Sequence, residues 1–248
     1  MTDHFQTLEA FNVIIVGNGA IASALLDNLL RRPALAHAVV LGRSDKDGRQ
    51  DARITRLLFD AVDPDSITRA ASRTGELIGR AHLLINTVGM LHSGSQQPEK
   101  QLRRLDPQHL QQSFLVNATL LPLLAQAFGK LLRHDEPAML VSLSARVGSI
   151  EDNKAGGWYS YRASKAAHNM LLKTLALEWK LSHRKATVVA LHPGTVISRL
   201  SGPFIPPSYA KPLLSPAESA EALLQVMTQL RPEHSGNFYD WQGERIPW

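Results

Sequence analysis

The amino-acid sequence predicts an α/β protein with a doubly wound parallel sheet, formed by a single domain over residues 1–248. Short apolar runs rich in β-branched residues alternate with longer helical patterns along the whole chain, which is typical of this fold class. No linker or change in composition interrupts the alternation. At 248 residues, of which 44% are hydrophobic, the chain is long enough to bury one substantial core.

Composition excludes several kinds of function. The sequence contains no Cys, which rules out disulfides, thiolate nucleophiles and zinc sites built on Cys. The net charge is +5, but the basic residues are scattered and accompany no nucleic-acid recognition motif. We therefore expect no nucleic-acid partner, and a small polyanionic ligand fits the charge equally well.

The sequence also predicts a soluble, cytoplasmic protein without a membrane partner. Residues 1–10 lack the basic start and apolar stretch of a secretory signal. The most apolar run, from Leu115 to Leu132, is interrupted by polar residues and a proline, which predicts that it is too polar to span a membrane.

The first strand is predicted from Asn12 to Val16, and a helical pattern follows that ends before Pro33. Between them lies Gly17-Asn18-Gly19-Ala20-Ile21-Ala22, which satisfies the pattern G-x-G-x-x-A. The first glycine permits a tight turn, the second lets the backbone approach a pyrophosphate, and Ala22 allows close packing of helix on strand. The following amides at the helix N-terminus favour a phosphate. The turn predicts Rossmann-like dinucleotide binding, with a plain glycine turn as the alternative.

A second strand from His37 to Leu41 leads into Gly42-Arg43-Ser44. An acidic residue at this position would bind the adenosine ribose, whereas a cation accommodates a 2′-phosphate. Arg43, with Lys46, Arg49 and Arg53 behind it, therefore favours NADP(H) over NAD(H), although Asp45 and Asp47 lie nearby. The alternative is a charged loop in solvent.

Two more strands are expected from Thr55 to Phe59 and from Ala81 to Ile85, with a helix from Pro64 to about Ile78 between them. Asp60 follows the third strand and either reaches the adenine amino group or only ends the strand. Asn86-Thr87-Val88-Gly89 follows the fourth strand, and residues 92–106 form a polar loop. A helix then begins near Pro107 and contains Asn117, whose cost in a helix interior calls for a reason.

The second half of the chain repeats the alternation. A fifth strand from Ala138 to Leu143 precedes Ser144 and a long loop, and the next helix runs from near Trp158 through Trp179. A sixth strand, Ala186 to Leu191, is closed by His192-Pro193-Gly194-Thr195. A proline-rich segment from Ser201 to Pro216, a helix from about Ala217 to Leu230 and a short strand from Phe238 to Trp241 complete the chain.

Tyr161 and Lys165 are separated by one helical turn, which directs a phenol and an ammonium group toward one point. A fixed cation near a phenol favours the phenolate, so we expect Lys165 to lower the pKa of Tyr161 and make it a better proton shuttle. A surface pair is the alternative, since motifs this short also occur by chance.

These pieces together resemble the short-chain dehydrogenase/reductase family over nearly the full length. The resemblance rests on the glycine turn, Asn86-x-x-Gly89, Asn117, a strand ending in Ser, Tyr161-x-x-x-Lys165 and Pro193-Gly194. Within the family the chain is most similar to the C-factor-like carbonyl reductase branch, on the basis of residues 147–150 (VGSI), residues 156–165 (GGWYSYRASK) and the ending Ile246-Pro247-Trp248.

The resemblance implies specific roles. Tyr161 would give a proton to a carbonyl oxygen as hydride arrives from the nicotinamide, or remove one in the reverse direction. Lys165 would lower the Tyr161 pKa and hold the nicotinamide ribose, Ser144 would orient the carbonyl oxygen, and Asn117 would fix its helix and a water that links Lys165 to solvent. The cofactor would be bound by Gly17, Asn18, Gly19, Ala20, Ile21, Arg43, Ser44, Asp60, Asn86, Gly89, Pro193, Gly194 and Thr195. Relatives also suggest a homodimer or homotetramer.

The chain departs from the family pattern at three places. Val16 replaces a Thr before a glycine turn that is one residue shorter than usual, and Ala22 replaces its last glycine. Thr87-Val88 replaces the middle of N-N-A-G. Where a second serine is common, the chain has Ala145, so Ser144 is the expected carbonyl-orienting residue and Ser149 the fallback.

Two functions therefore remain open: an NADP-dependent oxidoreductase acting on a carbonyl or alcohol, and a weakly catalytic or non-catalytic dinucleotide-binding sensor or signalling protein. A metal site is not expected, because none of the ten His residues lie three or four apart on a helix. A hydrolase is not expected either, since Ser144 lacks a G-x-S-x-G elbow. The predicted pocket walls suggest an apolar or aromatic carbonyl substrate; they are Met90, Leu91, His92, Trp158, Leu200 and Phe204.

Overall fold

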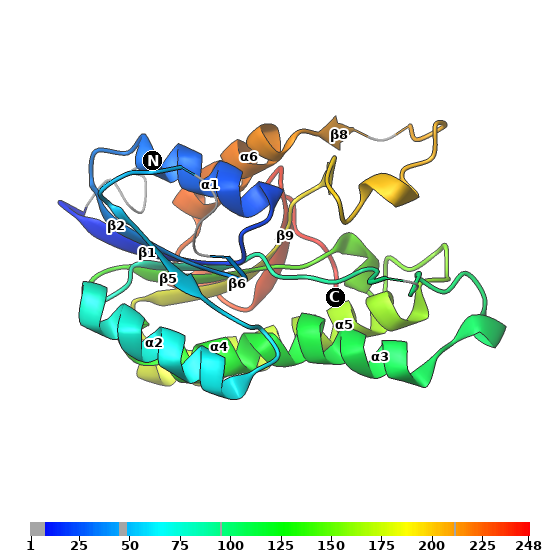
Figure 1. The fold of residues 1–248 in the computed structure, drawn as a ribbon, viewed down its shortest axis with the longest axis horizontal. Helices are drawn as coiled ribbons and strands as arrows, with labels where there is room; N and C mark the ends of the chain where they lie inside the picture. Colours follow the sequence, from blue (N-terminus) through cyan, green and yellow to red (C-terminus); the bar gives the residue numbers. More distant parts are fainter. Residues whose placement is uncertain (1–7, 45–48, 95, 211) are drawn as a thin grey trace.

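A seven-stranded parallel sheet with the strand order β3-β2-β1-β4-β5-β6-β9 forms the centre of the protein. The computed structural model describes residues 8–44, 49–94, 96–210 and 212–248 (Figure 1). The strands of this sheet are β1 (Phe11–Val16), β2 (Leu35–Gly42), β3 (Ile54–Leu58), β4 (Leu83–Asn86), β5 (Ala138–Leu143), β6 (Ala186–His192) and β9 (Asn237–Asp240). The chain builds outward from β1 to β3, then returns to the other side of β1 with β4. This reversal makes the sheet doubly wound, and it confirms the predicted fold class.

Helices cover both faces of the sheet. Helices α1 (Ala20–Leu30) and α6 (Pro216–Gln229) lie on one face, and α2 (Pro64–Ile78), α3 (Pro107–Phe114), α4 (Leu120–Phe128) and α5 (Tyr159–Ser182) on the other (Figure 1). Several N-termini are capped as local sequence dictates: Asp63 accepts a hydrogen bond from the amide of Asp65, and Ser215 forms a capping box with Glu218. These caps, each followed by a proline at the first helical positions, explain why the predicted helix starts are close to the observed ones.

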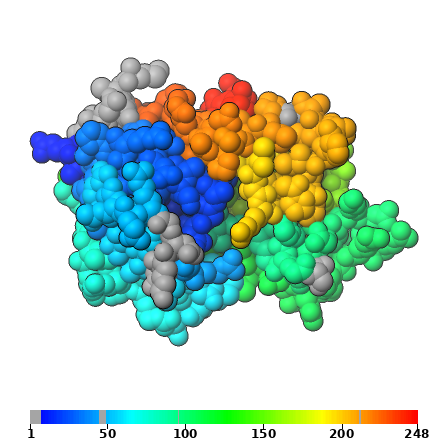
Figure 2. Space-filling view, turned by 45° about the horizontal axis from the view of Figure 1, so that its top comes forward, coloured from blue at the N-terminus to red at the C-terminus, as the bar shows by residue number. Residues whose placement is uncertain are grey.

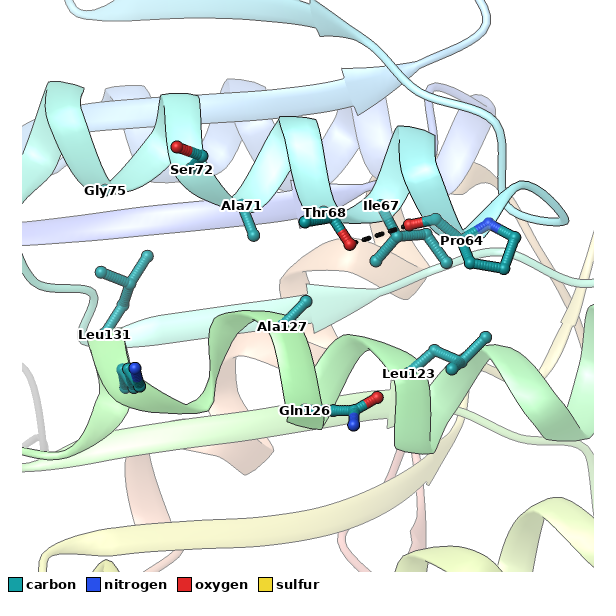
Figure 3. Close-up of a pocket in the computed structure, with 11 residues that line it drawn as sticks. Pro64, Ile67, Thr68, Ala71, Ser72, Gly75, Leu123, Gln126, Ala127 and Leu131 are labelled. Carbon is teal, nitrogen blue, oxygen red and sulfur yellow. Dashed lines mark hydrogen bonds between the residues drawn. The ribbon is translucent and has the colours of Figure 1, made fainter.

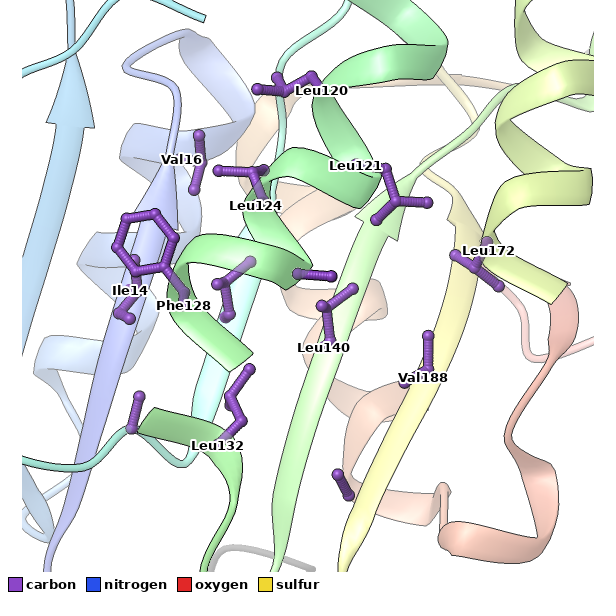
Figure 4. Packing of buried hydrophobic residues seen from close by; sticks show 14 of the residues in the cluster. Ile14, Val16, Leu120, Leu121, Leu124, Phe128, Leu132, Leu140, Leu172 and Val188 are labelled. Carbon is purple, nitrogen blue, oxygen red and sulfur yellow. The ribbon is translucent and has the colours of Figure 1, made fainter. Parts of the chain in front are cut away.

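Two apolar layers fill the space between the sheet and the helices. Successive residues of β1 point to opposite faces, so Val13 and Ile15 pack toward α1 and α6, while Ile14 and Val16 pack on the other side. Figure 4 shows this second layer, in which Phe128 lies against Ile14. Because both faces are covered, the central strands read as continuous apolar runs.

The helical segment that begins at Pro107 is interrupted rather than continuous. Residues Leu115–Thr119 form a π-helical turn (η2) between α3 and α4, and Gly129–Leu132 form a 3₁₀ turn (η3) at the end. Asn117 lies in the π turn, and its carbonyl accepts a hydrogen bond from Nδ1 of His168 on α5 at 2.9 Å. The sequence predicted one uniform helix here, because a π turn has the same hydrophobic pattern apart from one inserted residue.

The same segment, Pro107–Leu132, is long and apolar enough to cross a membrane by length and composition, with 26 residues and a mean hydropathy of 1.4 over its most apolar window. The sequence argument that its polar residues make it too polar therefore fails. Half of that window is buried inside the fold, and residues such as Leu121, Leu124 and Phe128 belong to the core. Burial of this kind is the behaviour of a core helix, and it is the better account of the apolar run.

The proline-rich segment contains structure that the sequence did not predict. Strands β7 (Thr195–Val196) and β8 (Leu213–Leu214) pair in parallel, and Gly202–Phe204 form a 3₁₀ turn (η5). The Thr195 hydroxyl lies 2.5 Å from the Tyr209 hydroxyl, within hydrogen-bond distance. The pairing of β7 with β8 and the contact of Thr195 with Tyr209 therefore lie just beyond the carboxyl end of β6.

Candidate active site

The candidate site residues gather at the carboxyl edge of the sheet. Gly17 follows β1, Arg43 follows β2, Asn86 ends β4, Ser144 follows β5 and Pro193 follows β6. In parallel sheets these ends lie along one edge, and the crevice opens where the strand order reverses. In the space-filling view the blue N-terminal part of the chain and the yellow segment after β6 border a hollow with green atoms at its floor (Figure 2).

Tyr161 and Lys165 lie on the buried face of α5, with exposed fractions of 8% and 3%. The surface-pair alternative is therefore wrong. Gly148, which packs against this helix, leaves room for the lysine, since a Cβ on Gly148 would lie 2.7 Å from Cβ of Lys165. The helix starts after Trp158, a residue in the left-handed region with φ of 53°. Such a conformation is strained for a non-glycine residue and needs support from its surroundings.

The Lys165 ammonium donates a hydrogen bond to the carbonyl of Leu143, the last residue of β5, at 3.0 Å. Burial lowers the pKa of Lys165 from 10.5 to about 8, because a charged group loses its hydration there. Gly89 lies against the same group: a Cβ on it would be 3.5 Å from Nζ of Lys165 and 3.7 Å from Oδ1 of Asn117. Lys165, Asn117 and Gly89 therefore meet at one point.

The pKa of Tyr161 differs from the sequence-based expectation. Burial raises it well above the ordinary value of 10.0, whereas we expected Lys165 to lower it. The cause is the loss of hydration around the buried phenolate. Tyr161 is therefore a protonated phenol at neutral pH, with its ring edge-on to Trp158 at a centroid distance of 6.3 Å.

Ser144 lies beside the same helix face. Its side chain is buried, and its hydroxyl donates to Oδ1 of Asn169 on α5 at 2.6 Å. The fallback, Ser149, is also buried, but its hydroxyl donates to the carbonyl of Trp248 at 3.3 Å and accepts from the amide of Asp152 at 3.1 Å. Ser149 is thus tied to the C-terminal residue, and Ser144 is the serine that contacts α5 through its side chain.

Asn117 connects the loop after β4 to α5. Its side chain accepts from the amide of Met90 at 2.7 Å and donates to the carbonyl of Met90 at 2.8 Å and to the hydroxyl of Ser164 at 3.0 Å. These bonds explain an Asn in the middle of an apolar helical segment. They agree with the expectation that Asn117 fixes this part of the fold, and the expected water between Lys165 and solvent stays a prediction.

The first crossover contains two glycines with different reasons to be there. Gly17 has φ of +106°, and a Cβ on it would lie 2.4 Å from the Thr87 hydroxyl, so the fold itself requires glycine. Gly19 has φ of −76°, and a Cβ there would meet nothing within 4 Å. Asn18, Gly19 and Ala20 are exposed, and no side chain caps the N-terminus of α1. The fold itself therefore does not require glycine at position 19.

The adenosine side rests on fewer cations than the sequence suggested. Arg53 forms an ion pair with Asp51 at 2.9 Å and donates to the carbonyl of Leu30, and Arg49 lies 3.5 Å from Asp27. Both guanidinium groups are therefore engaged with the protein. Asp45, Lys46 and Asp47 lie outside the described residues.

Arg43 is exposed and Ser44 half-buried at the end of β2. Asp60 acts as the end of its strand: its amide donates to the Ser66 hydroxyl at 2.9 Å and its carboxylate accepts from the amide of Val62 at 3.1 Å. Of the two roles considered for Asp60, the structure shows the turn-forming one. Of the predicted cations that lie in the described ranges, Arg43 is left as the candidate for a 2′-phosphate.

The remaining cofactor candidates shape the turns after β4 and β6. Asn86 donates to the Ser142 hydroxyl at 2.9 Å and accepts from the amide of Val88 at 3.1 Å. The Pro193 carbonyl accepts from the Ser219 hydroxyl at 2.7 Å. Gly194 has φ of +80°, and a Cβ there would lie 2.7 Å from Leu214. These bonds hold the ends of β4 and β6 in fixed turns.

Glu99 is a residue that the sequence analysis did not find. It is 3% exposed, and its carboxylate accepts from the amide of Ser160 at 3.1 Å and from the Ser160 hydroxyl. His109 lies 3.4 Å away, and the Glu99 carbonyl accepts from the amide of Trp158 at 2.5 Å. A carboxylate at this place is favourable because it faces the N-terminus of α5. Glu99 and Ser160 are 61 residues apart, so no local pattern in the sequence indicates their contact.

Aromatic rings bring the predicted pocket walls together. Phe204 lies 5.6 Å from Trp158 and 5.3 Å from His92, measured between ring centroids, and Trp158 in turn contacts Tyr161. The three rings come from three separate loops. They form an aromatic wall beside Tyr161, as the sequence predicted for Trp158, Phe204 and His92.

A pocket of about 470 Å³ lies elsewhere, between α2 and the segment formed by α4 and η3 (Figure 3). It is lined by Ile67, Ala71 and Gly75 on one side and by Leu123, Ala127 and Leu131 on the other. None of its lining residues belongs to the candidate site. Its walls are mostly small or apolar, and we assign it no chemistry.

Three potential metal ligands also gather at the opposite edge of the sheet, where His82, His134 and Glu136 have ligand atoms within 4.8 Å of one another. Nδ1 of His82 accepts a hydrogen bond from the amide of Asn12 at 3.0 Å, so Nε2 carries the proton and donates to Glu136 at 2.7 Å. Coordination by His82 would require it to give up one of these bonds. The cluster, which sequence spacing did not indicate, joins the beginnings of β1, β4 and β5.

Comparison with known proteins decides the family. The model of the short chain dehydrogenase family matches residues 12–205. The chain belongs to the short-chain dehydrogenase/reductase family. The resemblance to this family that was seen in the sequence is therefore confirmed.

Among curated relatives, C-signal of Myxococcus xanthus is 36% identical over 117 residues, covering 47% of this chain and 65% of the relative. The 1-hydroxy-2-glutathionyl-2-methyl-3-butene dehydrogenase of Rhodococcus is 38% identical over 114 residues, covering 46% of this chain and 48% of the relative. The matches to these first relatives thus span between about half and two thirds of their length. An uncharacterized oxidoreductase of Schizosaccharomyces pombe is 28% identical over 201 residues, or 77% of this chain and 76% of the relative.

Solved structures match the short-chain dehydrogenase/reductase fold over the whole chain. An NADPH-bound carbonyl reductase from chicken fatty liver superimposes with a TM-score of 0.84 and 25% identity, covering 97% of this chain and all of that one. The carbonyl reductase Sniffer of Drosophila melanogaster has the same TM-score at 22% identity, covering 97% of this chain and all of that one, and it supports the fold alone.

Proposed function

We propose that this short-chain dehydrogenase/reductase is an NADP(H)-dependent carbonyl reductase that uses Tyr161 as its proton donor. The observation that carries the proposal is the placement of Tyr161 and Lys165 on one buried face of α5, beside Ser144, at the carboxyl edge of the sheet. An apolar or aromatic carbonyl compound is the proposed substrate class, because Trp158, Phe204 and His92 line the approach to Tyr161.

The first crossover fits a dinucleotide. The open space at Gly19 and the uncapped N-terminus of α1 accommodate a pyrophosphate, whose negative charge the helix amides favour. Bound there, the nicotinamide cofactor supplies hydride to the carbonyl carbon. We propose that Asn18, Ala20 and Ile21 surround the phosphates, that Asn86 and Gly89 lie by the adenosine side, and that Pro193, Gly194 and Thr195 line the nicotinamide.

In the proposed reaction the protein handles the oxygen of the substrate. Ser144 donates a hydrogen bond to the carbonyl oxygen and stabilises the negative charge that develops there. Tyr161 then transfers its phenolic proton to this oxygen. Lys165 binds the nicotinamide ribose and, as a cation, stabilises the phenolate that Tyr161 becomes, while Asn117 holds α5 and the loop after β4 in place.

The raised pKa of Tyr161 keeps its phenol protonated, as a proton donor requires. A phenol with a high pKa keeps its proton at neutral pH, and the alkoxide it must protonate is far more basic, since the parent alcohol is about as weak an acid as water, with a pKa near ~15.7. Abstraction of a proton from an alcohol would first require the buried phenol to ionise. We therefore propose that Tyr161 enters the reduction as a protonated phenol at neutral pH.

The preference for NADP(H) is proposed on the basis of Arg43, an exposed cation directly after β2. Two similar structures contain this cofactor: the chicken carbonyl reductase is bound to NADPH, and a dehydrogenase/reductase from Burkholderia multivorans is bound to NADP. Titration of the protein with NADPH and with NADH tests this preference directly. Tighter binding of NADH would overturn it.

The function is tested by following NADPH oxidation with a panel of aldehydes, ketones and quinones. The expected result is turnover of at least one aromatic carbonyl compound, lost by about 10³-fold when Tyr161 is replaced by Phe, since positioned acid catalysis contributes roughly 10²–10⁴-fold. Binding of NADPH to Tyr161→Phe should be retained. Turnover by Tyr161→Phe at the rate of the parent enzyme would refute the proton-donor role.

A non-catalytic sensor or signalling role is the second candidate, motivated by the similarity to C-signal and by Ala145 in place of a second serine. This alternative predicts NADPH binding without turnover of any carbonyl in the panel. Detectable, Tyr161-dependent turnover would exclude it.

We further propose that the protein is cytoplasmic and forms a homodimer or homotetramer. The outer face of α5 exposes Met170, Leu177 and Leu181, with exposed fractions of 67%, 61% and 81%. Apolar residues in a row at helical spacing are typical of a contact with another helix. Sedimentation of the parent protein and of Leu181→Glu tests this, and a monomeric parent protein would refute the proposed assembly.

A further inference from the structure

Asn169 is a buried polar residue on the active face of α5 that has no role so far. It lies four residues after Lys165 and eight after Tyr161, so the three side chains follow one another on the same face of the helix. Only 3% of Asn169 is exposed. Burying an amide costs free energy unless the amide is hydrogen-bonded.

The main partner of Asn169 is the proposed carbonyl-orienting serine. The Ser144 hydroxyl donates to Oδ1 of Asn169 at 2.6 Å, and both groups are buried. The other end of the amide, Nδ2, reaches the carbonyl of Gly148 only at 3.5 Å, the outer limit of a hydrogen bond. The amide is therefore held firmly on the side of Ser144 and loosely on the other.

This contact determines where the single hydrogen of the Ser144 hydroxyl points. While that hydrogen is donated to Asn169, it is not available to a substrate carbonyl oxygen. An amide differs from a carboxylate because it also has N–H donors. If the Asn169 amide turns over, Nδ2 donates to Oγ of Ser144, and the serine hydrogen is released for the substrate. The turn gives up only a long bond to Gly148, and it brings Oδ1 to face the Gly148 carbonyl oxygen in place of Nδ2.

We propose that Asn169 is a positioning residue that sets the direction of the Ser144 hydroxyl, holding its hydrogen before the substrate arrives and donating to its oxygen afterwards. The inference rests on the proposed function, in which Ser144 orients the carbonyl. It deepens that function because residues 145–148 (ARVG) offer no second hydroxyl to take over the task. Asn169 acts through Ser144 and is not assigned a contact with substrate.

The decisive variant is Asn169→Asp, which has the same shape but only accepts hydrogen bonds when ionised. At pH 7.5 or above the carboxylate should keep the Ser144 hydrogen, so kcat should fall about tenfold or more. As the pH is lowered and the introduced carboxyl group takes up a proton, a donor returns and the loss should shrink. The KM for NADPH should stay unchanged, because Asn169 is not among the residues proposed to bind the cofactor.

The matched control is Asn28→Asp on α1, whose side chain donates to the carbonyl of Ala24 within its own helix. It should keep the parent kcat and pH profile. Asn169→Leu supplies neither donor nor acceptor and should lower kcat by a factor that does not change with pH. An Asn169→Asp variant with the kcat and pH profile of the parent, or with an equal loss at every pH, would overturn the proposal.

A second measurement needs no activity. In a double-mutant cycle of Ser144→Ala and Asn169→Leu, followed by urea unfolding, the two changes should be non-additive, because each removes the same hydrogen bond. Additive effects would show that the bond is absent and overturn the inference. If the parent protein reduced no carbonyl while the cycle stayed non-additive, the proposed function would fail and the link between Asn169 and Ser144 would stand.

Discussion

The centre of α5 and the first crossover form two halves of one candidate site, and they are built in opposite ways. On α5 the side chains of Tyr161, Lys165 and Asn169 are buried, and those of Lys165 and Asn169 are hydrogen-bonded to Leu143 and Ser144. At the crossover, Asn18, Gly19 and Ala20 are exposed, and the helix N-terminus has no side-chain cap. The side chains on α5 are thus held by contacts within the protein. The crossover instead exposes backbone groups that are open to a ligand.

The largest effect is expected at the crossover, where Gly17→Ala and Gly19→Ala separate folding from binding. Gly17→Ala combines a positive φ with a clash against Thr87, and should lower the free energy of unfolding by about 2–4 kcal/mol. Gly19→Ala has room and an ordinary φ, and should leave the free energy of unfolding nearly unchanged while it weakens NADPH binding. Urea unfolding and NADPH titration of both variants measure the two effects.

If Gly19→Ala lowered the free energy of unfolding as much as Gly17→Ala, the fold would require both glycines and the distinction between them would be wrong. Equal affinity of Gly19→Ala and the parent for NADPH would likewise show that the ligand does not approach this residue.

A smaller effect is expected on α5, where the burial of Lys165 is costly to the fold. Because its pKa falls from 10.5 to about 8, the unfolded chain holds the proton more tightly than the folded one. Below pH 8 the buried ammonium therefore lowers the free energy of unfolding by its full amount. The free energy of unfolding rises again as the pH increases from 8 toward 10.5. Lys165→Met should raise the free energy of unfolding at pH 7 by about 1–3 kcal/mol, and by less at pH 10.

Urea unfolding at the two pH values checks this prediction, with Lys180→Met on the exposed side of α5 as the control. The control should change stability little at either pH. The difference in free energy of unfolding between Lys165→Met and the parent should change between the two pH values. The same difference at both would show that burial of the ammonium does not destabilise the fold. Turnover of Lys165→Met should fall in any case, since the variant lacks the cation that stabilises the Tyr161 phenolate.

The smallest effect is expected at Arg43. Its exposed guanidinium should contribute about tenfold to NADPH affinity through contact with the 2′-phosphate, so Arg43→Ala should raise the Kd for NADPH by this factor and leave that for NADH unchanged. Arg49→Ala is the matched control, because its partner is Asp27. A parallel loss of both cofactors in Arg43→Ala would contradict a phosphate-specific role.

The sequence predicted the fold almost completely, because strands buried on both faces read as apolar runs and helix starts carry caps such as Asp63 and Ser215. It also predicted which ends of strands meet, since parallel strands share an edge. It did not predict the π turn at Asn117 or the pairing of β7 with β8, which depend on contacts with distant residues.

Within the site, spacing on one helix indicated Tyr161 and Lys165 as neighbours, and the family resemblance implied Ser144. The pKa of Tyr161 was expected in the wrong direction, because burial around the ring follows from packing that spacing does not reveal. Glu99 was missed because its partner Ser160 is 61 residues away. Asn169 could have been predicted from the sequence, because it is a polar residue on the same helical face as Tyr161.

The π turn at Leu115–Thr119 lets one helical segment direct side chains toward two different neighbours. Each residue turns an α-helix by about 100°, so the inserted residue allows Asn117 to face α5 while Leu121 and Leu124 continue to face the sheet. Deleting one residue there would restore a regular helix but force a choice between the two contacts. A short irregularity in an otherwise ordinary core helix thus joins α5 to the layer that packs on the sheet.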